Sequence, residues 1–432
     1  MSAAAFGMNR SIFLGTRIGY AHYRTPYFLS TDLLTRHCYV IGKTGTGKTT
    51  LLQTAVSSLI RQDCGVGVID PHGDFAEHTL SLIPPERIDD VVYLNLTDEE
   101  YAPALNLVSS NTEPSSRPLI ASSLVAAFRH IWSESWGPRM EYILYNSIRV
   151  LLDSENSSLV SLPRLLSDAK FRRKIVRQCR DPFVMKFWTE EFEVWEKRFR
   201  LEAIAPIQNK LGQFTTIPAL RHCFGQVRLR VDFRELLDSG KILVVNLSKG
   251  KLGDDASRLV GALLTAFLSS IAMSRADMPA EQRRDFILFI DEAQNFLSDA
   301  LTSILSESRK YGLGLVLSHQ FLDQLPPRIQ NAVLGNAGSI ISFAISGDDA
   351  ERFETNFGDS FKGHQFTDLP RFTTFIRAAD EPWCPFRLEV APPDFLVYGY
   401  QKSIVARCRQ RYCGSRTDIE ARLNRWLNRR HS

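Results

Sequence analysis

The sequence lacks the cysteine patterns that mark zinc sites and disulfide frameworks. Its seven cysteines are scattered and odd in number, and no two of them have C-x-x-C spacing. A chain of 432 residues can bury enough surface to fold without disulfide bonds. We therefore expect a reducing, cytoplasmic compartment and neither a zinc site nor a disulfide framework.

Long apolar runs and a secretion signal are missing as well. The first residues do not show the basic-then-apolar pattern of a signal peptide. The longest apolar stretch, Leu259 to Met273, contains Gly, Thr and Ser and is too short to span a bilayer. It predicts a buried helix, so we expect a soluble protein without an intrinsic membrane span.

A strong net charge is absent, but the charges are unevenly distributed. The chain has 52 Lys and Arg against 48 Asp and Glu, a net charge of +4. Residues 401–432 hold nine basic and two acidic residues, a charge of +7, which leaves −3 for residues 1–400. With 44% hydrophobic and 23% charged residues, the composition excludes a disordered, collagen-like or coiled-coil chain.

Short apolar runs alternate with helical patterns through much of the chain. Continuous apolar strands between helices are typical of a parallel sheet covered on both faces, so the predicted fold class is α/β. Residues 113–230 differ, because they carry few strand patterns and several amphipathic stretches that predict an inserted helical subdomain. The predicted strands are 37–41, 66–69, 91–94, 242–247, 286–290, 313–318 and 339–345.

These patterns predict four segments. Residues 35–112 and 231–398 form the α/β domain, which the helical insert at 113–230 interrupts. Residues 1–34 are too few for a separate domain and predict a strand or arm on the α/β domain. Residues 399–432 predict a basic helical tail, in which Thr417 to Glu420 have the pattern of a capping box.

The first chemical motif directly follows the strand predicted at 37–41 and precedes a helical pattern. Its glycines let backbone N–H groups wrap closely around phosphates, and the N-terminus of the following helix favours an anion. We expect Lys48 to reach the β- and γ-phosphates and the Thr49 hydroxyl to bind Mg²⁺, which predicts a site for ATP and Mg²⁺. The motif matches G-x-x-x-x-G-K-[ST] and consists of Gly42, Lys43, Thr44, Gly45, Thr46, Gly47, Lys48 and Thr49.

Two carboxylates follow the strand predicted at 286–290, at the end of the strand where α/β proteins bind ligands. Asp291 is expected to hold Mg²⁺, mostly through water, and Glu292 to orient and deprotonate the attacking water. Alternatively, Asp291 caps a helix that follows the strand, which is a common role for Asp. The phosphate loop in the same chain favours the catalytic interpretation.

Two further polar residues flank the strand predicted at 313–318. Gln320, just past the strand, is expected to sense the γ-phosphate and position water, although a plain turn residue is the alternative. Arg309 precedes the strand, after a segment of helical character at 301–308. It suits an arginine finger that reaches a neighbouring subunit's nucleotide. It equally suits a solvated helix end, where cations complement the helix dipole.

The ordered set of motifs resembles the HerA/FtsK superfamily of ring-forming, DNA-pumping ATPases, and is most similar to the branch of conjugative type IV coupling proteins. The resemblance covers residues 30–395, and the ordered set is far more specific than the phosphate loop alone. Besides Gly42–Thr49 it rests on Asp70-Pro71-His72-Gly73-Asp74, Trp136-Gly137-Pro138-Arg139, Asn209-Lys210-Leu211-Gly212, Asn246-Leu247-Ser248-Lys249-Gly250, Asp291-Glu292-Ala293-Gln294, Ser308-Arg309-Lys310-Tyr311-Gly312-Leu313 and Ser318-His319-Gln320.

The resemblance implies a RecA-like P-loop NTPase fold, a homohexameric ring and DNA that is tracked or threaded through its centre. It implies the roles given above for Lys48, Thr49, Asp291 and Glu292. It also favours Arg309 as the arginine finger and Gln320 as the residue that senses the γ-phosphate. Asp70 and His72 are expected near the site without a catalytic role.

The sequence departs from this family pattern in two places. Relatives often have an arginine in the strand that corresponds to 339–345, where this chain has Ala344, which leaves Arg309 as the main candidate for contact between subunits. We expect residues 1–34 to be too few for the transmembrane segments of membrane-bound coupling proteins. Any attachment to the inner membrane is therefore expected through partner proteins.

Contacts to DNA phosphates are expected from basic residues. Lys249 and Lys251 follow the strand predicted at 242–247, and the insert has seven basic residues against one acidic residue between Arg164 and Arg180. Aromatic residues follow and are able to stack single-stranded bases, but we prefer a helix with a charged outer face and an aromatic core. The arginines of the tail face DNA, a partner or water. The aromatic residues are Phe183, Phe187, Trp188, Phe192 and Trp195.

The leading hypothesis is an ATP-driven DNA translocase of the conjugative-transfer type, with relaxase or secretion-pore proteins as partners. The alternative is a HerA-like motor that works with a nuclease in DNA processing or phage defence. A hypothesis of another class is a scaffold that assembles on ATP without productive hydrolysis, and Glu292 and Gln320 argue against it. A small-molecule kinase is disfavoured by the size of the insert and by the ordered motifs.

Overall fold

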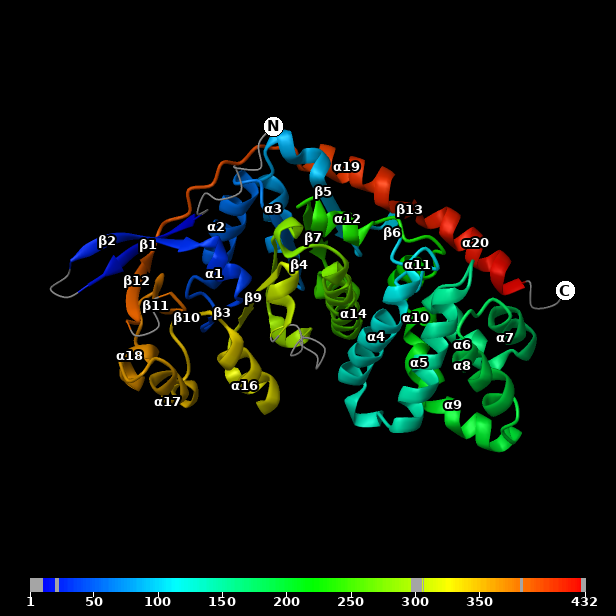
Figure 1. Cartoon of the computed structure of the whole chain (residues 1–432). Helices are drawn as coiled ribbons and strands as arrows, with labels where there is room; N and C mark the ends of the chain where they lie inside the picture. Colours follow the sequence, from blue (N-terminus) through cyan, green and yellow to red (C-terminus); the bar gives the residue numbers. More distant parts are fainter. Residues whose placement is uncertain (1–10, 20–22, 297–304, 306, 381–383, 429–432) are drawn as a thin grey trace. The chain divides into compact units, whose positions relative to one another are not determined.

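The structure is a computed structural model that describes residues 11–19, 23–296, 305, 307–380 and 384–428 (Figure 1). The chain divides into two compact units. Unit 1 comprises Met1–Val91, Arg234–Val245 and Arg275–Ile404, and unit 2 comprises Val92–Phe233, Asn246–Ser274 and Val405–Ser432. Unit 2 thus takes in residues 92–112, a long apolar helix and most of the tail in addition to the segment that we expected as a helical insert.

Unit 1 is built on a sheet with the strand order β2-β1-β12-β11-β10-β3-β9-β8-β4-β7. From β10 through β3, β9 and β8 to β4 the neighbours are parallel, whereas β2, β1, β12, β11 and β10 pair in antiparallel fashion. The fold is therefore α/β with a mostly parallel core, as predicted. The strands are β1 (Ser11–Ile18), β2 (Arg24–Ser30), β3 (Cys38–Ile41), β4 (Gly65–Asp70), β7 (Ile242–Asn246), β8 (Phe286–Ile290), β9 (Leu313–His319), β10 (Ser339–Ser342), β11 (Thr373–Ala378) and β12 (Phe386–Val390).

The parallel strands form where the sequence has continuous apolar runs. Every residue of β3, β4, β7, β8, β9 and β10 is buried, which is the pattern of strands covered on both faces. β10 is shorter than the predicted 339–345, because the chain leaves the sheet after Ser342. The carbonyl of Ala344 accepts a hydrogen bond from the backbone N–H of Lys43 at 2.7 Å, so this segment supports the phosphate loop instead of extending the strand.

The antiparallel side of the sheet contains strands that the sequence analysis missed. Residues of β12 alternate between buried and partly exposed positions, and its polar Arg387 and Glu389 interrupt the apolar run. The segment expected as an N-terminal strand or arm forms a hairpin of β1 and β2, with β1 paired to β12 (Figure 1). Residues 1–10 of that arm and most of the helical segment expected at 301–308 lie outside the described residues.

Helices accompany the strands of unit 1. α2 begins at Lys48, so its first two residues are the last two of the phosphate-loop motif, and it buries the face that carries Leu52, Val56 and Leu59. α3 begins at Asp74 after β4, and Asp70 organises its first turn. The helices of unit 1 are α1 (Thr31–Thr35), α2 (Lys48–Arg61), α3 (Asp74–Ser81), α12 (Phe233–Asp238), α16 (Pro327–Asn336), α17 (Gly347–Asn356) and α18 (Gly363–Thr367).

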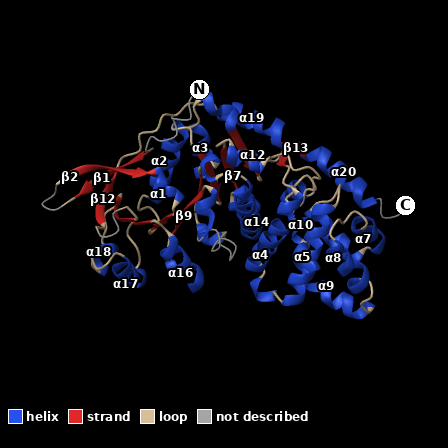
Figure 2. Cartoon of the chain, viewed as in Figure 1, coloured by secondary structure: helices blue, strands red, loops and turns tan. Residues whose placement is uncertain are grey.

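Unit 2 is mostly helical, and between residues 114 and 224 the structure contains helices, turns and loops but no strand (Figure 2). Its strands are β5 (Val91–Asn95), at the boundary between the units, and the pair β6 (Tyr101–Pro103) and β13 (Cys413–Ser415). Its helices are α4 (Arg117–Ile131), α5 (Pro138–Asp153), α6 (Leu162–Ser167), α7 (Ala169–Val176), α8 (Pro182–Lys186), α9 (Lys197–Leu211), α10 (Gln213–Thr216), α11 (Pro218–Phe224), α13 (Lys249–Leu252), α14 (Asp254–Ser274) and α20 (Arg416–Asn428), and α19 (Gln401–Tyr412) begins in unit 1 and continues in unit 2.

The longest apolar stretch forms α14, as predicted for a buried helix. α14 is long and apolar enough to cross a membrane, yet most of its apolar window is buried inside the protein, where it packs on α4. A mostly buried helix of this kind is the core helix of a folded unit.

The aromatic residues of the insert pack into its core. Phe187, Trp188 and Phe192 are each at most 1% exposed, whereas Phe183 is 83% exposed. Arg172 lies against this core, with an ion pair to Glu193 at 2.8 Å. The structure therefore agrees with a charged outer face and an aromatic core for this region, with the exception of Phe183.

The tail consists of α19 and α20, joined through β13. α20 begins at Arg416, so Thr417 lies inside the helix and does not cap it as we expected. The reason is that β13 runs directly into the helix, and the N–H of Arg416 donates to the carbonyl of Glu100 at 2.9 Å.

Candidate active site

The register of the parallel strands brings four loops to one edge of the unit 1 sheet. Ile41 of β3 is paired with His319 of β9, and Leu317 of β9 is paired with Ile290 of β8. Ile290 is in turn paired with Ile69 of β4. The phosphate loop, Gln320, Asp291 and Asp70 follow these strands, so they meet at the carboxyl edge where α/β proteins bind ligands.

The phosphate loop runs from Gly42 to the start of α2. Gly47 has φ +122°, and a Cβ at this position would lie 2.8 Å from Cδ1 of Phe372, so glycine is required there. Lys48 is buried, and its Nζ donates to the carbonyl oxygens of Gly42 at 2.5 Å and Lys43 at 3.1 Å. Burial lowers the pKa of Lys48, and the carboxylates of Glu292 and Asp291 oppose this effect.

Asp291 lies at the end of β8, and its side chain is buried. Burial is the largest cause of the raised pKa of Asp291, about 6, and the nearby carboxylates of Glu292 and Asp70 raise it further. A carboxyl group with this pKa lies among negative charges without enough positive charge to balance them. A divalent cation would supply that charge.

Glu292 has a left-handed backbone conformation, with φ 47°. A side chain other than glycine costs about 1 kcal/mol in this region, and such strain tends to occur at functional sites. Its carboxylate accepts hydrogen bonds from Gln320 Nε2 at 2.8 Å and from Gln294 Nε2 at 2.7 Å. Burial would raise the pKa of Glu292, but these bonds and the charge of Lys48 lower it, so the side chain is an anion at neutral pH.

Gln320 connects the phosphate loop to Glu292. Its Oε1 accepts a hydrogen bond from the Thr44 hydroxyl at 3.0 Å, while its Nε2 donates to the Glu292 carboxylate. The side-chain amide of Gln320 therefore connects this loop to the carboxylate of Glu292. This contact between two distant parts of the chain is more than a plain turn residue requires.

A cavity of about 350 Å³ opens at this edge of the sheet. Thr49 and Asp291, which we expect to hold Mg²⁺, both line it, and Thr49 is exposed at its surface. A hydroxyl and a carboxylate are the oxygen ligands that Mg²⁺ takes from a protein when phosphates and water complete its shell. These residues therefore fit a magnesium-bound nucleotide. The Asp291 carboxyl is buried and its pKa is raised, which supports the same conclusion.

Asp70 and His72 lie beside the cavity, as expected. The Asp70 carboxylate accepts backbone N–H groups of His72, Gly73 and Ala76 at 2.8, 2.9 and 2.9 Å. These bonds shape the turn before α3, so Asp70 has a structural role in the first turn of that helix. His72 lines the cavity.

Two residues of the cavity were missed by the sequence analysis, Arg371 and Phe372. Phe372 has φ 62°, and its backbone N–H donates to the carbonyl of Thr46 at 2.8 Å, which holds the phosphate loop. The guanidinium of Arg371 lies 4.7 Å from the centre of the Phe372 ring and is exposed at the cavity. No local motif marks them, because they precede β11, one of the strands that was not foreseen.

Arg309 lies away from this cavity. It is exposed in the turn Ser308–Tyr311, before β9, whereas Gln320 follows the other end of that strand. Seven residues of strand span about 23 Å. Arg309 also lies close enough to His37, which precedes β3, to lower its pKa together with burial. Arg309 is therefore at the opposite edge of the sheet from the cavity of its own chain.

Some of the residues that we expected to contact DNA are buried and form ion pairs within the protein. Arg164 and Arg172 are buried and pair with Asp168 and Glu193. Lys251 is exposed on α13, which begins at Lys249. Exposed cations of the α7 region are Lys170, Arg173, Lys174, Arg177 and Arg180.

Comparison with known sequences matches this chain to a family. The family model described as "Helicase HerA, central domain" matches residues 12–268. A probable helicase of Methanocaldococcus jannaschii, MJECL08, is 22% identical over 357 residues, which are 79% of this chain. The match spans 63% of the length of that relative.

Solved structures of two proteins share the fold. The plasmid coupling protein TrwB in complex with a non-hydrolysable GTP analogue has a TM-score of 0.67 and 18% identity, covering 92% of this chain and 98% of that solved chain. TrwB in complex with ADP and Mg²⁺ has a TM-score of 0.66, 18% identity and coverage of 91% and 98%. VirB4 of Thermoanaerobacter pseudethanolicus has a TM-score of 0.62 and 14% identity, covering 91% of this chain and 99% of that chain. At these identities the similarity shows the fold, which is that of RecA-like P-loop NTPases.

Proposed function

Because this chain belongs to the family of the HerA helicase central domain, among the HerA/FtsK-type P-loop ATPases, we propose that it is an ATP-hydrolysing ring motor that translocates DNA in a conjugative-transfer process. It would bind ATP with Mg²⁺, act in the cytoplasm as a homohexamer, and work with relaxase or secretion-pore proteins. The fold is shared with TrwB over 98% of the solved TrwB chain, which supports the conjugative branch.

The observation that carries this proposal is the hydrogen-bonded connection from Thr44 through Gln320 to Glu292. It joins the loop that we propose binds phosphate to the carboxylate that we propose activates water. A protein that only assembled on ATP would need the phosphate loop but not an ionised, oriented glutamate beside it. The arrangement therefore favours hydrolysis over a non-hydrolysing scaffold.

The chain's own residues suggest how hydrolysis would proceed. The backbone N–H groups of Gly45 to Thr49 would surround the phosphates, and Lys48 would turn from its carbonyl partners toward them. Thr49 and Asp291 would hold Mg²⁺, which would supply positive charge to offset that of the phosphates. Glu292, kept anionic by its two amide partners, would accept the proton of the attacking water.

The direct test is phosphate release with and without single- and double-stranded DNA. Lys48→Ala should abolish turnover and Glu292→Gln should reduce it by ~10²–10⁴-fold. Lys43→Ala is the matched control, because Lys43 is also a lysine of the phosphate loop but its side chain is exposed and does not line the cavity. A ring whose turnover is the same with no DNA and with either form of DNA would refute the translocase.

The position of Arg309 is compatible with an arginine finger only across a subunit interface, and we propose that it acts in this way. Rings mixed from Arg309→Ala and Lys48→Ala protein test this proposal. Interfaces that pair an intact cavity with an intact Arg309 should regain activity that neither variant has alone. If the mixed rings do not regain activity, Arg309 is a solvent-exposed turn residue and not an arginine finger.

A second candidate function is a HerA-like motor that acts with a nuclease in DNA processing or phage defence. The match of residues 12–268 to the HerA central domain favours it, as does the similarity to a probable helicase. Both candidates require DNA-dependent ATP hydrolysis. Purification of the native complex separates them, because a nuclease partner supports the second candidate, and a relaxase or pore partner supports the first.

A further inference from the structure

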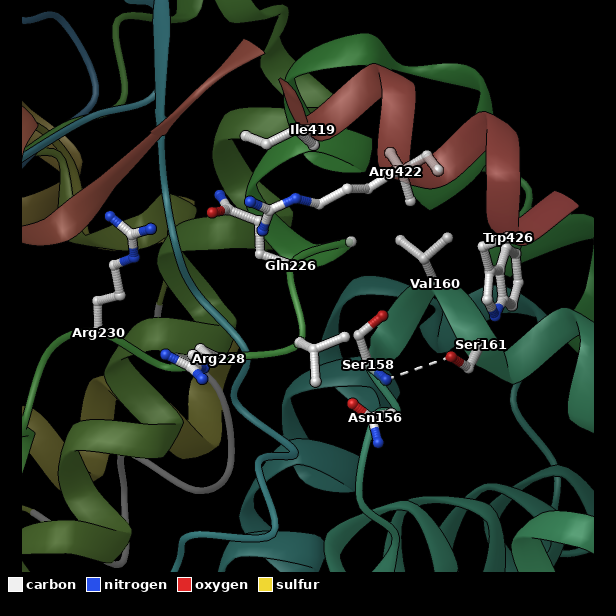
Figure 3. Close-up of a pocket in the computed structure, with 13 residues that line it drawn as sticks. Asn156, Ser158, Val160, Ser161, Gln226, Arg228, Arg230, Ile419, Arg422 and Trp426 are labelled. Atoms are coloured by element: carbon white, nitrogen blue, oxygen red, sulfur yellow. Dashed lines mark hydrogen bonds between the residues drawn. The ribbon is translucent and has the colours of Figure 1, made fainter. Parts of the chain in front are cut away.

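Unit 2 contains a cavity that includes no residue of the candidate active site. It has a volume of about 490 Å³ and lies between α20, the segment 156–161 and the loop after α11 (Figure 3). A second cavity of about 510 Å³ shares Gln226, Arg230, Ile419 and Arg422 with it, so the hollow continues past Arg422 along β13. Cavities of ~300–1,000 Å³ are typical of ligand-binding sites.

The walls of the cavity are held in place by part-buried hydrogen bonds and close packing. Glu420 of α20 accepts hydrogen bonds from Arg221 at 2.7 Å and pairs with His222 at 2.5 Å, which fixes the helix against α11. A Cβ on Gly225 would lie 3.0 Å from Leu423, so the loop and the helix are in close contact. The Gln226 side-chain amide donates to the carbonyl groups of three residues of unit 2, Ala102, Pro103 and His222, each at 3.1 Å. The cavity is therefore preformed.

One side of the cavity is cationic. Arg228, Arg230 and Arg422 line it, and none of its 13 lining residues, all within the described chain, is acidic. Arg230 donates one hydrogen bond to the carbonyl of Cys413. Among the described residues, Arg228 and Arg422 have no hydrogen bond or ion pair, and Figure 3 shows the Arg422 guanidinium turned toward Gln226 inside the cavity. Asp418 is the single carboxylate of the adjoining second cavity.

The other side of the cavity is apolar. Val160 and Leu423 are buried, and Val227 at its rim is 41% exposed. Trp426 completes this side, and Figure 3 shows it beside Val160. One face of the Trp426 ring is already covered by Arg164, whose guanidinium lies 5.1 Å from the ring centre. The indole thus serves mainly as a wall.

We propose that this cavity binds an acidic peptide segment of a partner protein, with a large apolar side chain of the segment against Val160, Leu423 and Trp426. Carboxylates on either side of that apolar residue would pair with Arg228 and Arg422, which are free to form bidentate hydrogen bonds. An apolar anchor in a preformed pocket with arginines at its edge is the arrangement that carries most of the binding energy in protein interfaces. The continuation toward β13 gives an extended segment room on one side.

Nucleic acid fits the same cavity less well. A DNA backbone has phosphates for the arginines, but its sugars offer no large apolar group for an aliphatic wall. Trp426 is the only aromatic ring among the 13 lining residues and Arg164 covers one of its two faces, so single-stranded bases would have a single ring face to stack on. Apolar and cationic walls together favour a peptide.

The test is fluorescence anisotropy on the full-length protein without nucleotide, with a labelled peptide Glu-Asp-Asp-Leu-Phe-Asp-Glu as the probe. Because no ATP is present, failure of this proposal would leave the proposed ATPase function intact. Arg228→Glu/Arg422→Glu should weaken binding at least ~10-fold, and Val227→Ser should weaken it by a few-fold. Val227 is exposed at the rim, so its replacement leaves the core intact.

Arg425→Glu is the matched control, because Arg425 is an exposed arginine of the same helix that lines neither cavity. It should change the affinity by less than about twofold. A second probe that carries Ser-Ser in place of Leu-Phe should bind at least ~10-fold more weakly than the first. The proposal is overturned if the wild-type protein does not bind the first probe at roughly 1 mM, or if the two probes bind equally. It is also overturned if a labelled single-stranded oligonucleotide binds more tightly than the peptide and loses affinity in the Arg228→Glu/Arg422→Glu variant.

Discussion

Gln320→Ala should separate hydrolysis from nucleotide binding. The substitution removes the donor to Glu292 at 2.8 Å and the acceptor of the Thr44 hydroxyl at 3.0 Å, but it leaves the backbone of the phosphate loop and Lys48 unchanged. We therefore expect the affinity for ADP to stay within about threefold of the wild-type value while kcat falls.

The size of the fall follows from the bonds that are lost. A hydrogen bond to a charged group contributes about 1.5–3 kcal/mol, and the bond from Gln320 to the Glu292 carboxylate is of this kind. If that bond orients the base in the transition state, kcat should fall by ~10–100-fold, since 1.4 kcal/mol corresponds to tenfold. The pKa of Glu292 should also rise, because one of the hydrogen bonds that lower it is gone.

Gln294→Ala is the matched control. Gln294 also donates to the Glu292 carboxylate, at 2.7 Å, but it has no bond to the phosphate loop. It should reduce kcat by less than Gln320→Ala, because the connection from Thr44 to the carboxylate survives. Steady-state phosphate release gives kcat and KM, and a fluorescent ADP analogue gives the affinity. A Gln320→Ala enzyme with a wild-type kcat would refute the reasoning.

A double-mutant cycle with Thr44→Val tests the connection itself. Valine has the shape of threonine but has no hydroxyl, so it removes only the 3.0 Å bond to Gln320. If Thr44 acts through Gln320, the double variant should be non-additive by about 0.5–3 kcal/mol in the activation free energy. Additive effects would show that the two side chains act independently.

Three further predictions concern the same unit. Gly47→Ala should lower the free energy of unfolding by about 1–3 kcal/mol and abolish ADP binding, because Gly47 has φ +122° and a Cβ there would lie 2.8 Å from Phe372. Thermal melts measure the stability and an ADP titration measures the binding. An ADP affinity equal to that of the wild type would contradict this prediction. Arg371→Ala should raise KM for ATP about tenfold at an unchanged melting temperature, since Arg371 is exposed and lines the cavity; an unchanged KM would remove Arg371 from the site. Burial lowers the pKa of His37 and of His319 to about 4, from 6.5 in the unfolded chain. Between pH 4 and pH 6.5 the unfolded state therefore binds more protons than the folded state. Stability is lost as the pH falls from 6.5 toward 4. Each histidine should lower the free energy of unfolding by about 1.4 kcal/mol at about pH 5.5 relative to neutral pH. In denaturant titrations, His319→Gln should remove roughly half of this pH dependence. An unaltered pH dependence would contradict this prediction.

The parallel core of the sheet was predictable because its signals are local. The apolar runs that became β3, β4 and β8 are continuous, and the residues that follow them carry polar side chains at the edge where ligands bind. Glycine at position 47 is likewise visible as a motif, although the reason for it is Phe372, which lies more than 300 residues further along the chain. In these cases the local pattern and the tertiary structure agree.

The parts that escaped prediction depend on contacts between distant segments. β11 begins with two threonines and contains Arg377, and β12 has polar residues at alternate positions, so neither strand has a continuous apolar pattern, and Arg371 and Phe372 were missed with them. The bond between Gln320 and Glu292 exists because the register of β8 and β9 aligns their ends, which no motif states. The peptide-sized cavity unites α20 with residues 156–161, about 260 positions apart, and has no sequence signal at all.

We propose that this chain moves along DNA with the energy of ATP hydrolysis. The most direct measurement is displacement of streptavidin from biotinylated ends of single- and double-stranded DNA by the assembled protein. We predict ATP- and Mg²⁺-dependent displacement from at least one of these substrates, lost in Lys48→Ala and retained in Lys43→Ala. Hydrolysis of ATP by a ring that binds DNA, without displacement from either substrate, would contradict the account.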